Sequence, residues 1–498
     1  MSSSFLVDKL QSLVSDWRNN NYANTLPETR NILEHITRIG FLHRPQLEAL
    51  ETYIYLKEVV GNRPTVEIIK GLFTDEKELL QGIGVSKEEA FDLLGNKEAI
   101  EALLTEKFGE SLDYANQVYA LTMGSGKTIL MAAFMIYDFV LSYYHPKDRR
   151  FGKNALVFAP DKTIIESLKE IKSFDYSKIV PKEYLNVLLG LKYHYLEDTK
   201  SALAPIGNYN VIVTNSQKII LKTKKEATRS LLSDLQELEK REVENKRLAA
   251  IRNLESLLIF VDEAHHSYGK SLEGSLKKTR QTINYIHGNK PLVGVLNLTG
   301  TPYVNNRMIP DVVFHFGLKQ GIEQGILKQV RFYEYSNVKS EEFIEDVVEK
   351  FWSEYGENKL EDKLPKIAFY AANIEEIQSD LRPKLEKILA NRSISLGKVL
   401  EYHTEAEESR DEFNDLDKPE SKKQFILLVG KGTEGWNCRS LTSTALYRKP
   451  RSSIFVLQSS TRCLRSIGDN STKASVFVSN ENYKILDKEL KKNFQTSI

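Results

Sequence analysis

The sequence has few cysteines and no apolar run long enough to cross a membrane. Only two of its 498 residues are Cys, which excludes a disulfide framework and, since neither has metal-ligand spacing, favours a reducing compartment. The most apolar helix candidate, Ile129–Tyr144, contains Asp138 and is shorter than the roughly 20 residues that a bilayer requires. No basic segment precedes the first apolar stretch, so no signal peptide is expected. We therefore expect a cytoplasmic protein without membrane contact.

Neither sign of charge dominates the whole chain, because 69 Lys+Arg face 68 Asp+Glu. A hydrophobic share of 41% and a charged share of 28% exclude a disordered or fibrous chain. The balance hides a division, since residues 1–115 carry 12 basic and 19 acidic side chains and residues 426–498 carry 12 and 5. The chain thus has an acidic beginning and a basic end, and its length predicts about three structural units.

The pattern of apolar residues divides the chain in the same way. Residues 1–115 show helical spacing and a capping box at Ser86–Glu89, so we expect a helical N-terminal extension there. From Gln117 onward, apolar runs alternate with helical stretches, which is typical of parallel sheets built from βαβ units. The runs form two sets: Val118–Leu121, Ala155–Ala159, Val211–Val213, Leu257–Val261 and Leu292–Leu298; then Ile367–Tyr370, Lys398–Tyr402, Phe425–Val429, Ser443–Tyr447 and Ser475–Val478. We predict two α/β domains in tandem, at 116–325 and 326–498.

Two charged segments interrupt this alternation. Residues 221–255 are dense in Lys, Arg and Glu, and predict an exposed helical insertion in the first α/β domain, either a solvated face or a partner contact. Residues Ser340–Lys363 are acidic and helical, and we expect them between the two sheets.

A phosphate-binding loop is predicted between the first apolar run and the helix that follows it. The segment reads Gly124-Ser125-Gly126-Lys127-Thr128. Glycines let backbone N–H groups approach a phosphate at a helix N-terminus, whose dipole favours anions. Lys127 is expected to reach the β- and γ-phosphates of ATP, and the Thr128 hydroxyl to hold Mg²⁺. An ordinary glycine turn before a helix is the alternative.

Two further loops follow apolar runs downstream. Asp262 and Glu263 end the run Leu257–Val261, and we expect Asp262 to bind Mg²⁺ through water and Glu263 to polarise the attacking water. His265 is a candidate link between the ATP site and the rest of the protein. A Thr-Gly-Thr-Pro segment containing Thr301 would be a simple turn by itself, but in this order it predicts an element that couples nucleotide and polymer binding.

Basic residues near the end of the chain complete the set. Arg462 and Arg465 stand three residues apart, and the spacing predicts that both lie on one face of a helix that also carries Gln458. Guanidinium groups suit the charge of a transferring phosphoryl group, so we expect arginine fingers that complete the ATP site when the domains close. A basic surface helix is the alternative.

Together, these motifs resemble a superfamily-two helicase or translocase of the DEAD/DEAH-box type, and above all the motor subunit of type III restriction enzymes. The resemblance covers about Phe41 to the C-terminus and implies two RecA-like domains in tandem that use ATP and Mg²⁺. It implies further sites. Gln46 would read the adenine, Pro160 and Thr214 would track a nucleic-acid strand, Gln458 and Thr433 would couple the sites, and Gly435 and Asn437 would contact the nucleotide.

The sequence departs from the family pattern at several positions. Leu121 replaces the first P-loop Gly, Thr461 replaces the Gly before the first finger arginine, and Asn437 replaces an Asp that contacts ribose. The interval from Gln46 to Lys127 predicts an acidic helical insertion. Since the chain ends soon after Arg465, we expect no nuclease domain and no intrinsic nuclease activity.

The motifs predict an ATP-dependent motor of restriction or phage-defence type that acts on nucleic acid, double-stranded DNA rather than RNA. A second hypothesis is an ATP-switched DNA-binding subunit that docks a nuclease or methylase without translocating. A third hypothesis, a protein-remodelling ATPase, is disfavoured by the separate Gln458–Arg465 element.

Overall fold

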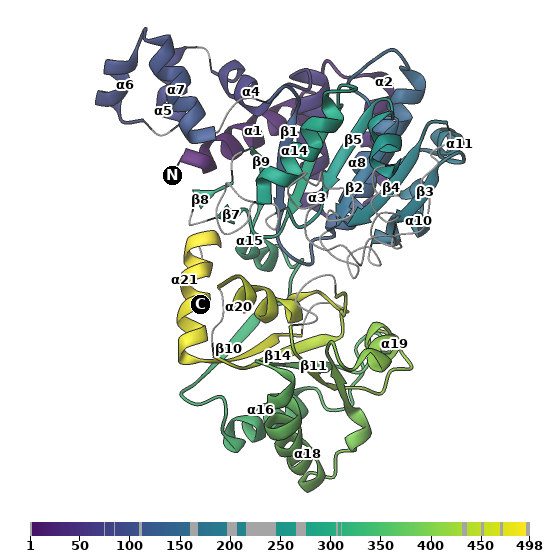
Figure 1. The fold of residues 1–498 in the computed structure, drawn as a ribbon, viewed down its shortest axis with the longest axis vertical. Coiled ribbons are helices and arrows are strands. Elements are labelled where there is room, and N and C mark those ends of the chain that lie inside the picture. The colour runs from purple at the N-terminus through teal and green to yellow at the C-terminus, as the bar shows by residue number, and fades with distance from the viewer. Residues whose placement is uncertain are drawn as a thin grey trace, which may run out of the picture. The chain divides into compact units, whose positions relative to one another are not determined.

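A computed structural model describes residues 2–73, 75–83, 85–108, 112–159, 168–196, 207–215, 246–264, 275–304, 307–309, 311–430, 436–449, 453–468 and 472–494. The chain divides into two compact units (Figure 1). The first comprises Met1–Leu121 and Gly126–Phe316, and the second comprises Thr122–Ser125 and Gly317–Ile498. Among the described residues, no helix has both the length and the apolar character needed to cross a bilayer.

The first unit is built on a parallel sheet. Its described strands follow the order β3-β4-β2-β5-β6-β1-β9. Their bounds are β1 (Asn116–Leu121), β2 (Asn154–Ala159), β3 (Lys192–Leu196), β4 (Asn210–Asn215), β5 (Leu257–Val261), β6 (Gly294–Thr299) and β9 (Val312–Phe316). Since β6 lies between β1 and β5 and all three run parallel, their carboxyl ends lie at one edge of the sheet. A short antiparallel pair, β7 (Tyr303–Val304) and β8 (Arg307–Met308), follows β6.

Both faces of this sheet are covered by helices. On β1, Val118 and Ala120 belong to a buried cluster that includes Ile283 of α14 (Ser275–His287). The intervening Tyr119 points to the opposite face, where its ring lies 4.9 Å from that of Phe134 on α8 (Lys127–Tyr144). Successive side chains of β1 therefore point to opposite faces of the sheet, and both faces are buried. The remaining short helices of this unit are α10 (Glu170–Ser173), η2 (Tyr176–Lys178), η3 (Lys182–Tyr184) and α11 (Leu185–Leu188).

Helix α8 is held along its length by a second helix that runs parallel to it. This partner is α3 (Arg44–Ile54), continued by the π-helical turn η1 (Tyr55–Val59). Gln46 of α3 contacts Gly126, Tyr53 packs on Phe134 with ring centroids 4.7 Å apart, and Lys57 of η1 binds Asp138. Because each partner lies 80 or 81 residues further along the chain, the two helices keep one register from end to end.

A buried ion pair fixes this register. The Lys57 Nζ atom lies 2.6 Å from Asp138 Oδ1, and the two side chains are 1% and 0% exposed. Asp138 also accepts hydrogen bonds from the Tyr53 hydroxyl and from the Gly152 backbone N–H, the latter at 2.7 Å. Burial lowers the pKa of Lys57 and raises that of Asp138, so the pair depends on these contacts to remain charged.

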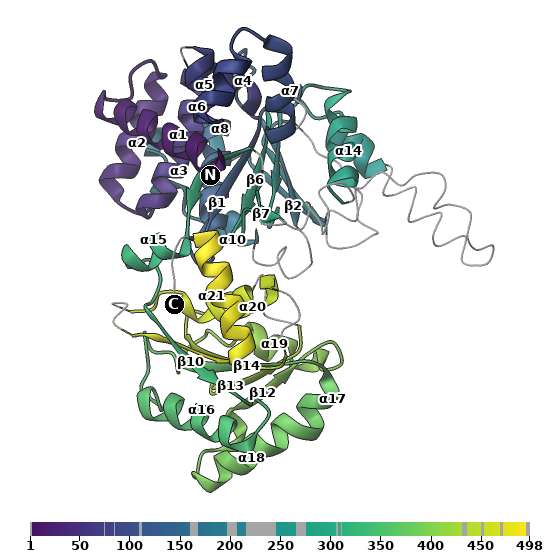
Figure 2. The same cartoon turned by 90° about the vertical axis from the view of Figure 1, so that its left-hand side faces the viewer.

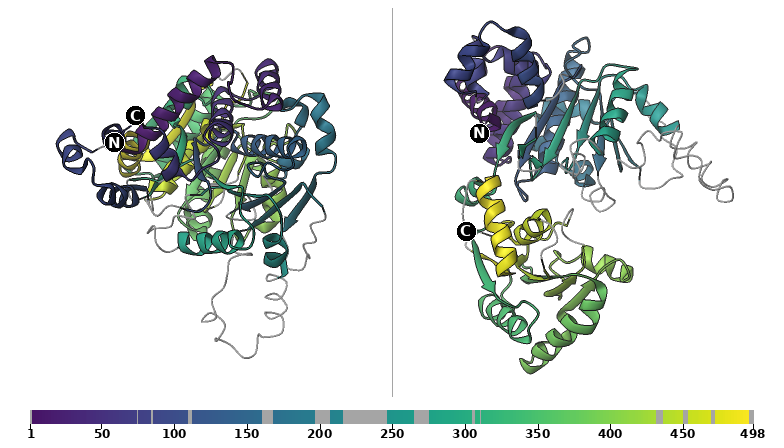
Figure 3. Two further views of the ribbon diagram at one scale, coloured as in Figure 1. Left: turned by 90° about the horizontal axis from the view of Figure 1, so that it is seen from above. Right: turned by 60° about the vertical axis from the view of Figure 1, so that its left-hand side comes forward.

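The described part of residues 2–108 contains helices and no strand. Helices α4–α7 gather beside the sheet of the first unit (Figures 2 and 3). The helices in addition to α3 and η1 are α1 (Ser2–Asn19), α2 (Pro27–Ile39), α4 (Thr65–Gly71), α5 (Glu76–Gly82), α6 (Lys87–Leu93) and α7 (Lys97–Phe108). The predicted capping box is confirmed, since the Ser86 and Glu89 side chains each accept from the other's backbone N–H.

The second unit contains another parallel sheet, with the strand order β10-β15-β14-β11-β13-β12 in its described residues. The bounds are β10 (Val330–Tyr335), β11 (Lys366–Ala371), β12 (Val399–Tyr402), β13 (Phe425–Leu428), β14 (Leu441–Tyr447) and β15 (Ala474–Ser479). One face packs on α19 (Arg410–Asn414), α20 (Ser453–Ser460) and α21 (Asn480–Phe494). The other face packs on α16 (Glu341–Glu354) and α18 (Arg382–Asn391). Shorter helices are α15 (Leu318–Glu323), α17 (Ile374–Glu376), η6 (Ile377–Leu381), η7 (Leu396–Lys398), η8 (Glu407–Ser409) and η9 (Thr461–Leu464).

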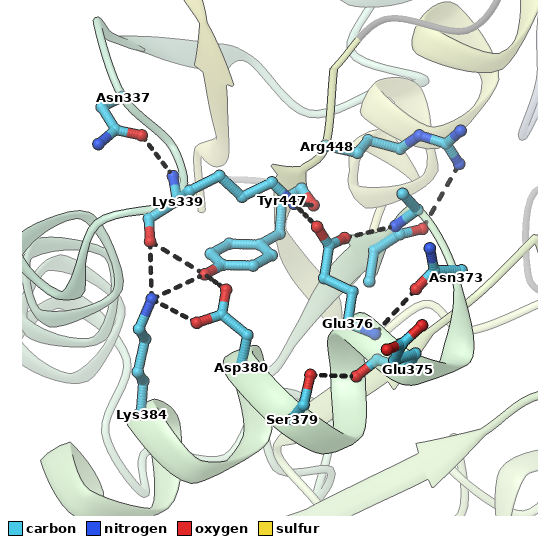
Figure 4. Close-up of polar contacts among 12 residues, drawn as sticks. Asn337, Lys339, Asn373, Glu375, Glu376, Ser379, Asp380, Lys384, Tyr447 and Arg448 are labelled. Carbon is cyan, nitrogen blue, oxygen red and sulfur yellow. Dashed lines mark hydrogen bonds and ion pairs between the residues drawn. The ribbon is translucent and has the colours of Figure 1, made fainter.

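A polar cluster around Tyr447 ties the carboxyl ends of this sheet to the neighbouring helices (Figure 4). The Tyr447 hydroxyl donates to Asp380 of η6 at 2.6 Å and lies 3.1 Å from the Lys339 carbonyl oxygen. Lys384 of α18 donates to the same carbonyl at 2.9 Å, and the Lys339 ammonium donates to the Tyr447 carbonyl at 2.7 Å. The cluster therefore joins β14, η6, α18 and the turn before α16.

The predicted fold class is confirmed: the described residues form two parallel-sheet, RecA-like domains in tandem, with a helical N-terminal extension. All ten predicted strands are present. The position predicted for Ser340–Lys363 is wrong, because β10 precedes this segment and pairs with β15, so its helix α16 packs against the second sheet. Most of the predicted insertion 221–255 lies outside the described residues, although 246–252 is helical.

Replacing Lys57 with Met should lower the free energy of unfolding by about 3–5 kcal/mol, because Asp138 is left as a buried carboxylate without its cation. Urea denaturation followed by circular dichroism measures this loss. Lys290→Met is the matched control, since Lys290 pairs with Glu255 at 3.2 Å on the surface and should cost less than about 1 kcal/mol. Equal losses in the two variants would contradict the proposed role of the buried pair.

Candidate functional site

The loop between β1 and α8 has the backbone of an anion-binding turn. Gly124 and Gly126 have φ values of 82° and 75°, in the left-handed region that glycine adopts without strain. Gly126 is the N-cap of α8, so Lys127 and Thr128 are the first two residues of that helix. The buried Ser125 hydroxyl donates to the Thr122 carbonyl at 2.7 Å and closes the turn. Free N–H groups at such a helix start favour a phosphate.

Gln46 lies directly against this loop. Its Oε1 atom accepts from the His43 N–H at 2.8 Å, which caps α3, and its Nε2 atom donates to the Gly126 carbonyl at 3.0 Å. A Cβ atom at Gly126 would lie 2.5 Å from Nε2, so only glycine permits this approach. Gln46 therefore supports the backbone of the phosphate loop, while its adenine-reading role stays a prediction.

The carboxylates after β5 stand at the same edge of the sheet. The Asp262 N–H donates to Phe158 of β2 at 3.0 Å, and the Ala264 N–H donates to Leu298 of β6 at 2.9 Å. Glu263, held between these anchors, has a φ of 46°, which is unusual for a residue with a side chain. Its N–H donates to Asp262 Oδ1 at 3.0 Å. Backbone strain fixed by flanking hydrogen bonds is often found at functional sites.

The phosphate loop and the carboxylates meet at one ion pair. Lys127 Nζ lies 3.7 Å from Glu263 Oε1, and the two side chains are 12% and 14% exposed. The residues come from the ends of β1 and β5, which β6 separates. A cation suited to phosphate and a carboxylate suited to water therefore lie within reach of one small ligand.

The loop after β6 contributes Thr299 and Thr301. The Thr299 hydroxyl accepts from the Thr301 N–H at 3.1 Å and lies 3.2 Å from the Thr301 carbonyl oxygen. Thr301 is 6% exposed, and its hydroxyl has no hydrogen-bond partner among the described residues. Thr214, predicted to track a strand, is buried near the end of β4.

The two arginines predicted to be fingers, Arg462 and Arg465, contact the segment that follows β13 in the second unit. Arg462 Nη1 donates to the Trp436 carbonyl at 3.3 Å, and Arg465 Nη1 donates to the same carbonyl at 2.7 Å. Arg465 also donates to Asn437 Oδ1 at 2.6 Å. The second unit therefore brings together three of the predicted site residues.

The prediction that both arginines lie on one helix is wrong for Arg465. Helix α20 ends at Ser460, the 3-10 helix η9 ends at Leu464, and Arg465 is extended with a ψ of 133°. The reason is that the Leu464 carbonyl accepts from the Lys328 N–H at 2.7 Å, and Arg465 bridges to Leu327. These contacts with Leu327 and Lys328, just before β10, replace the backbone hydrogen bonds that a continued helix would make.

The other predicted residues fall into two groups. Gln458 is buried on α20, with 5% of its surface exposed. Four predicted site residues lie outside the described part of the chain, namely Pro160, His265, Thr433 and Gly435.

The residues present fit a nucleoside triphosphate. The positive-φ glycines and the start of α8 suit its phosphates, with Lys127 beside them. Thr128 and Asp262 are the candidate Mg²⁺ ligands. The described residues contain no group of three or more metal-ligating side chains.

Comparison with known proteins agrees with the motifs. Residues 95–304 match the family described as "Type III restriction enzyme, res subunit". Over these residues, the match confirms the resemblance to the motor subunit of type III restriction enzymes. A comparison with curated proteins gave no match.

Several solved structures are similar in fold. A fragment of a putative HsdR subunit of a type I restriction enzyme from Vibrio vulnificus YJ016 is 12% identical with a TM-score of 0.49, and the match covers 81% of this chain and 66% of that one. The type ISP restriction-modification enzyme LlaBIII bound to DNA is 13% identical with a TM-score of 0.46, covering 80% of this chain and 29% of that one. S. cerevisiae Dbp5 bound to RNA and ADP BeF3 is 11% identical with a TM-score of 0.44, covering 84% and 94%. The chain thus spans less than two thirds of the first and under a third of the second.

Gln46→Glu tests the contact between α3 and the phosphate loop. A glutamate keeps the cap on the His43 N–H but turns the donor at Gly126 into a repelling acceptor, so the Kd for ATP should rise about tenfold or more. Binding of a fluorescent ATP analogue measures this change. Gln320→Glu is the matched control, because Gln320 makes the same cap with the Gly317 N–H at 2.7 Å and should leave the Kd unchanged. Unaltered affinity in Gln46→Glu would disprove the supporting role.

Proposed function

We propose that this chain is an ATP-dependent nucleic-acid translocase or helicase of restriction or phage-defence type, acting on double-stranded DNA. The observation that carries the proposal is the Lys127–Glu263 pair, with 3.7 Å between Nζ and Oε1, at the start of a helix capped by a left-handed glycine. The preference for DNA is supported by the likeness of residues 95–304 to the Res subunit.

In the proposed reaction, the chain's own residues divide the work. The N–H groups at the start of α8 hold the phosphates, and Lys127 neutralises charge on the β- and γ-phosphates. Glu263 releases Lys127 to the nucleotide and orients the attacking water. Thr128 and Asp262 would hold Mg²⁺, which neutralises phosphate charge when bound.

The arginines of the second unit act on the same nucleotide in this proposal. Arg462 and Arg465 exchange their contacts with Trp436 and Asn437 for the γ-phosphate. Phosphate-bound guanidinium groups stabilise the charge that develops as the phosphoryl group moves. Loss of that charge after hydrolysis returns the arginines to their carbonyl partner, which gives the motor two alternating states.

An ATP-switched docking subunit is the second candidate, and the surface of α4–α7 favours it. Phe91 of α6 is 77% exposed and Leu94 is 39% exposed, in an acidic helical region. Exposed apolar side chains in a polar surround suit a protein partner such as a nuclease or methylase subunit. A triplex-displacement assay separates the candidates, because a switch hydrolyses ATP on DNA without displacing the third strand.

Glu263→Gln should keep ATP binding and lower kcat about 100-fold or more, because the amide cannot accept a proton from water. A phosphate-release assay on duplex DNA measures kcat, and a fluorescent analogue measures binding. Glu255→Gln is the control, since its carboxylate is 69% exposed and pairs only with the surface Lys290 among the contacts described. Undiminished hydrolysis in Glu263→Gln would refute the assignment of the site.

ATP hydrolysis should rise more with duplex DNA than with single-stranded DNA or RNA, compared side by side. Stimulation should fall steeply between 50 and 200 mM salt, because Lys and Arg contacts to phosphate release counterions. Equal rates with and without every nucleic acid would contradict the motor and favour a protein-remodelling ATPase.

A further inference from the structure

Lys328 is a fully buried lysine whose ammonium group is shared among three backbone carbonyls. It lies between α15 and β10, and none of its surface is exposed. Its Nζ atom donates to the carbonyls of Arg439 at 3.3 Å, Leu441 at 3.1 Å and Cys463 at 3.3 Å. An ammonium group has three N–H donors, so each can have an acceptor. Burying such a charge is costly without this arrangement.

The three carbonyls belong to two separate segments. Cys463 lies between the finger arginines Arg462 and Arg465, while Arg439 and Leu441 follow the Trp436–Asn437 segment that the arginines contact. The Lys328 backbone adds another link, because its N–H donates to the Leu464 carbonyl at 2.7 Å. Lys328 therefore fastens the backbone that carries the arginines to the backbone that carries their partners.

One other bond joins the same two segments, because Arg439 Nε donates to the Ser466 carbonyl at 3.1 Å, but the Arg439 side chain is 42% exposed whereas Lys328 is buried. The neighbouring buried Lys366 donates to the Leu364 carbonyl at 2.8 Å and to the Ser440 hydroxyl at 3.2 Å. Asp417 accepts from the Ser440 N–H at 2.9 Å. These bonds of Lys366 and Asp417 hold the segment before β14 and do not extend to the finger segment.

We propose that Lys328 is a positioning residue for the arginine fingers, whose ammonium group sets the distance between the Cys463 backbone and the Arg439–Leu441 segment. This inference rests on the proposed ATPase function. The fingers must leave Trp436 and reach a phosphate without loss of their backbone geometry. A fixed backbone confines that movement to the side chains, which reduces the entropy lost in the transition state.

The charge on Lys328 gives this role a pH dependence. Burial lowers its pKa to about 8, against the opposing effects of Cys463, Cys438 and Asp417, while Arg439 lowers it further. Above that pH the amine keeps two N–H donors, and its lone pair faces one of the three carbonyls. The backbone that carries Arg462 and Arg465 should therefore be held less firmly against the Arg439–Leu441 segment as the pH rises through about 8. Because the folded-state pKa is below that of the unfolded chain, this group does not weaken folding over the same range.

Kinetics on full-length chain with duplex DNA test the inference. Lys328→Met should lower kcat about tenfold to a hundredfold and leave the Kd for ATP within about threefold, since misplaced catalytic groups affect turnover more than ground-state binding. Wild-type kcat should fall above pH 8, and Lys328→Met should lack this descending limb. Lys366→Met, a matched buried lysine, should keep both kcat and the limb. A wild-type profile flat from pH 7 to 9.5, or the same profile in Lys328→Met, would overturn the inference.

A thiol measurement tests the same point without ATP hydrolysis. The chain has two cysteines, both buried, so Cys438→Ser leaves Cys463 as the only thiol. In that background at pH 7.5, Lys328→Met should speed the reaction of Cys463 with a thiol reagent about tenfold or more, and Lys366→Met should not. Equal rates refute the positioning role even if the protein is an ATPase. If the chain does not hydrolyse ATP but Cys463 still reacts faster in Lys328→Met, the proposed function is refuted. The result would still show that Lys328 fixes the position of the segment around Cys463.

Discussion

The parallel pairing of β1, β6 and β5 is the constraint on which the candidate ATP site depends. Ala120 of β1 pairs with Thr299 of β6, and Val261 of β5 pairs with Asn297, so all three strands end at nearly the same height. Loops that are far apart in the sequence must therefore emerge together. The 3.7 Å contact between Lys127 and Glu263 follows from this register more than from either loop by itself.

The helix that supports α8 extends this constraint into the N-terminal segment. Gln46 at the start of α3 and Lys57 in η1 bind Gly126 and Asp138 of the parallel helix α8. The deep ion pair therefore holds the register that keeps Gln46 on the phosphate loop. Any shift of one helix along the other would break both contacts together, so the stability of the extension and the shape of the loop are coupled.

Every inner strand of the two sheets was predicted from its apolar run, and the missed strands lie at sheet edges or in the short β7–β8 pair. The ten predicted runs became strands, one of them the edge strand β12, whereas the edge strands β3, β9 and β10 were not predicted. An edge strand such as β10, with its half-exposed alternation of polar and apolar residues, has no continuous apolar run. Such a strand is indicated in the sequence by alternating polar and apolar residues, and a search for continuous apolar runs does not detect it.

Motif residues were predictable because their chemistry is local, whereas their contacts were not. Glycines, a lysine and paired carboxylates identify a phosphate site because each motif consists of residues that are adjacent in the sequence. The bond from Gln46 to Gly126 crosses 80 residues, and the bonds from Lys328 cross more than 100. The helix predicted through Arg465 failed for the same reason, since Lys328 takes the Leu464 carbonyl that a continued helix would use.

The basic excess at the end of the chain includes side chains that are used inside the second unit. Arg448 and Arg462 are buried, and Arg462 and Arg465 bind the Trp436 carbonyl. Such groups cannot neutralise a phosphate backbone while they hold these positions. Lys484 and Lys488 on α21 are exposed. If the chain is the proposed motor, the salt dependence of its binding to nucleic acid should therefore reflect fewer phosphate contacts than the excess of 12 basic over 5 acidic residues in 426–498 indicates.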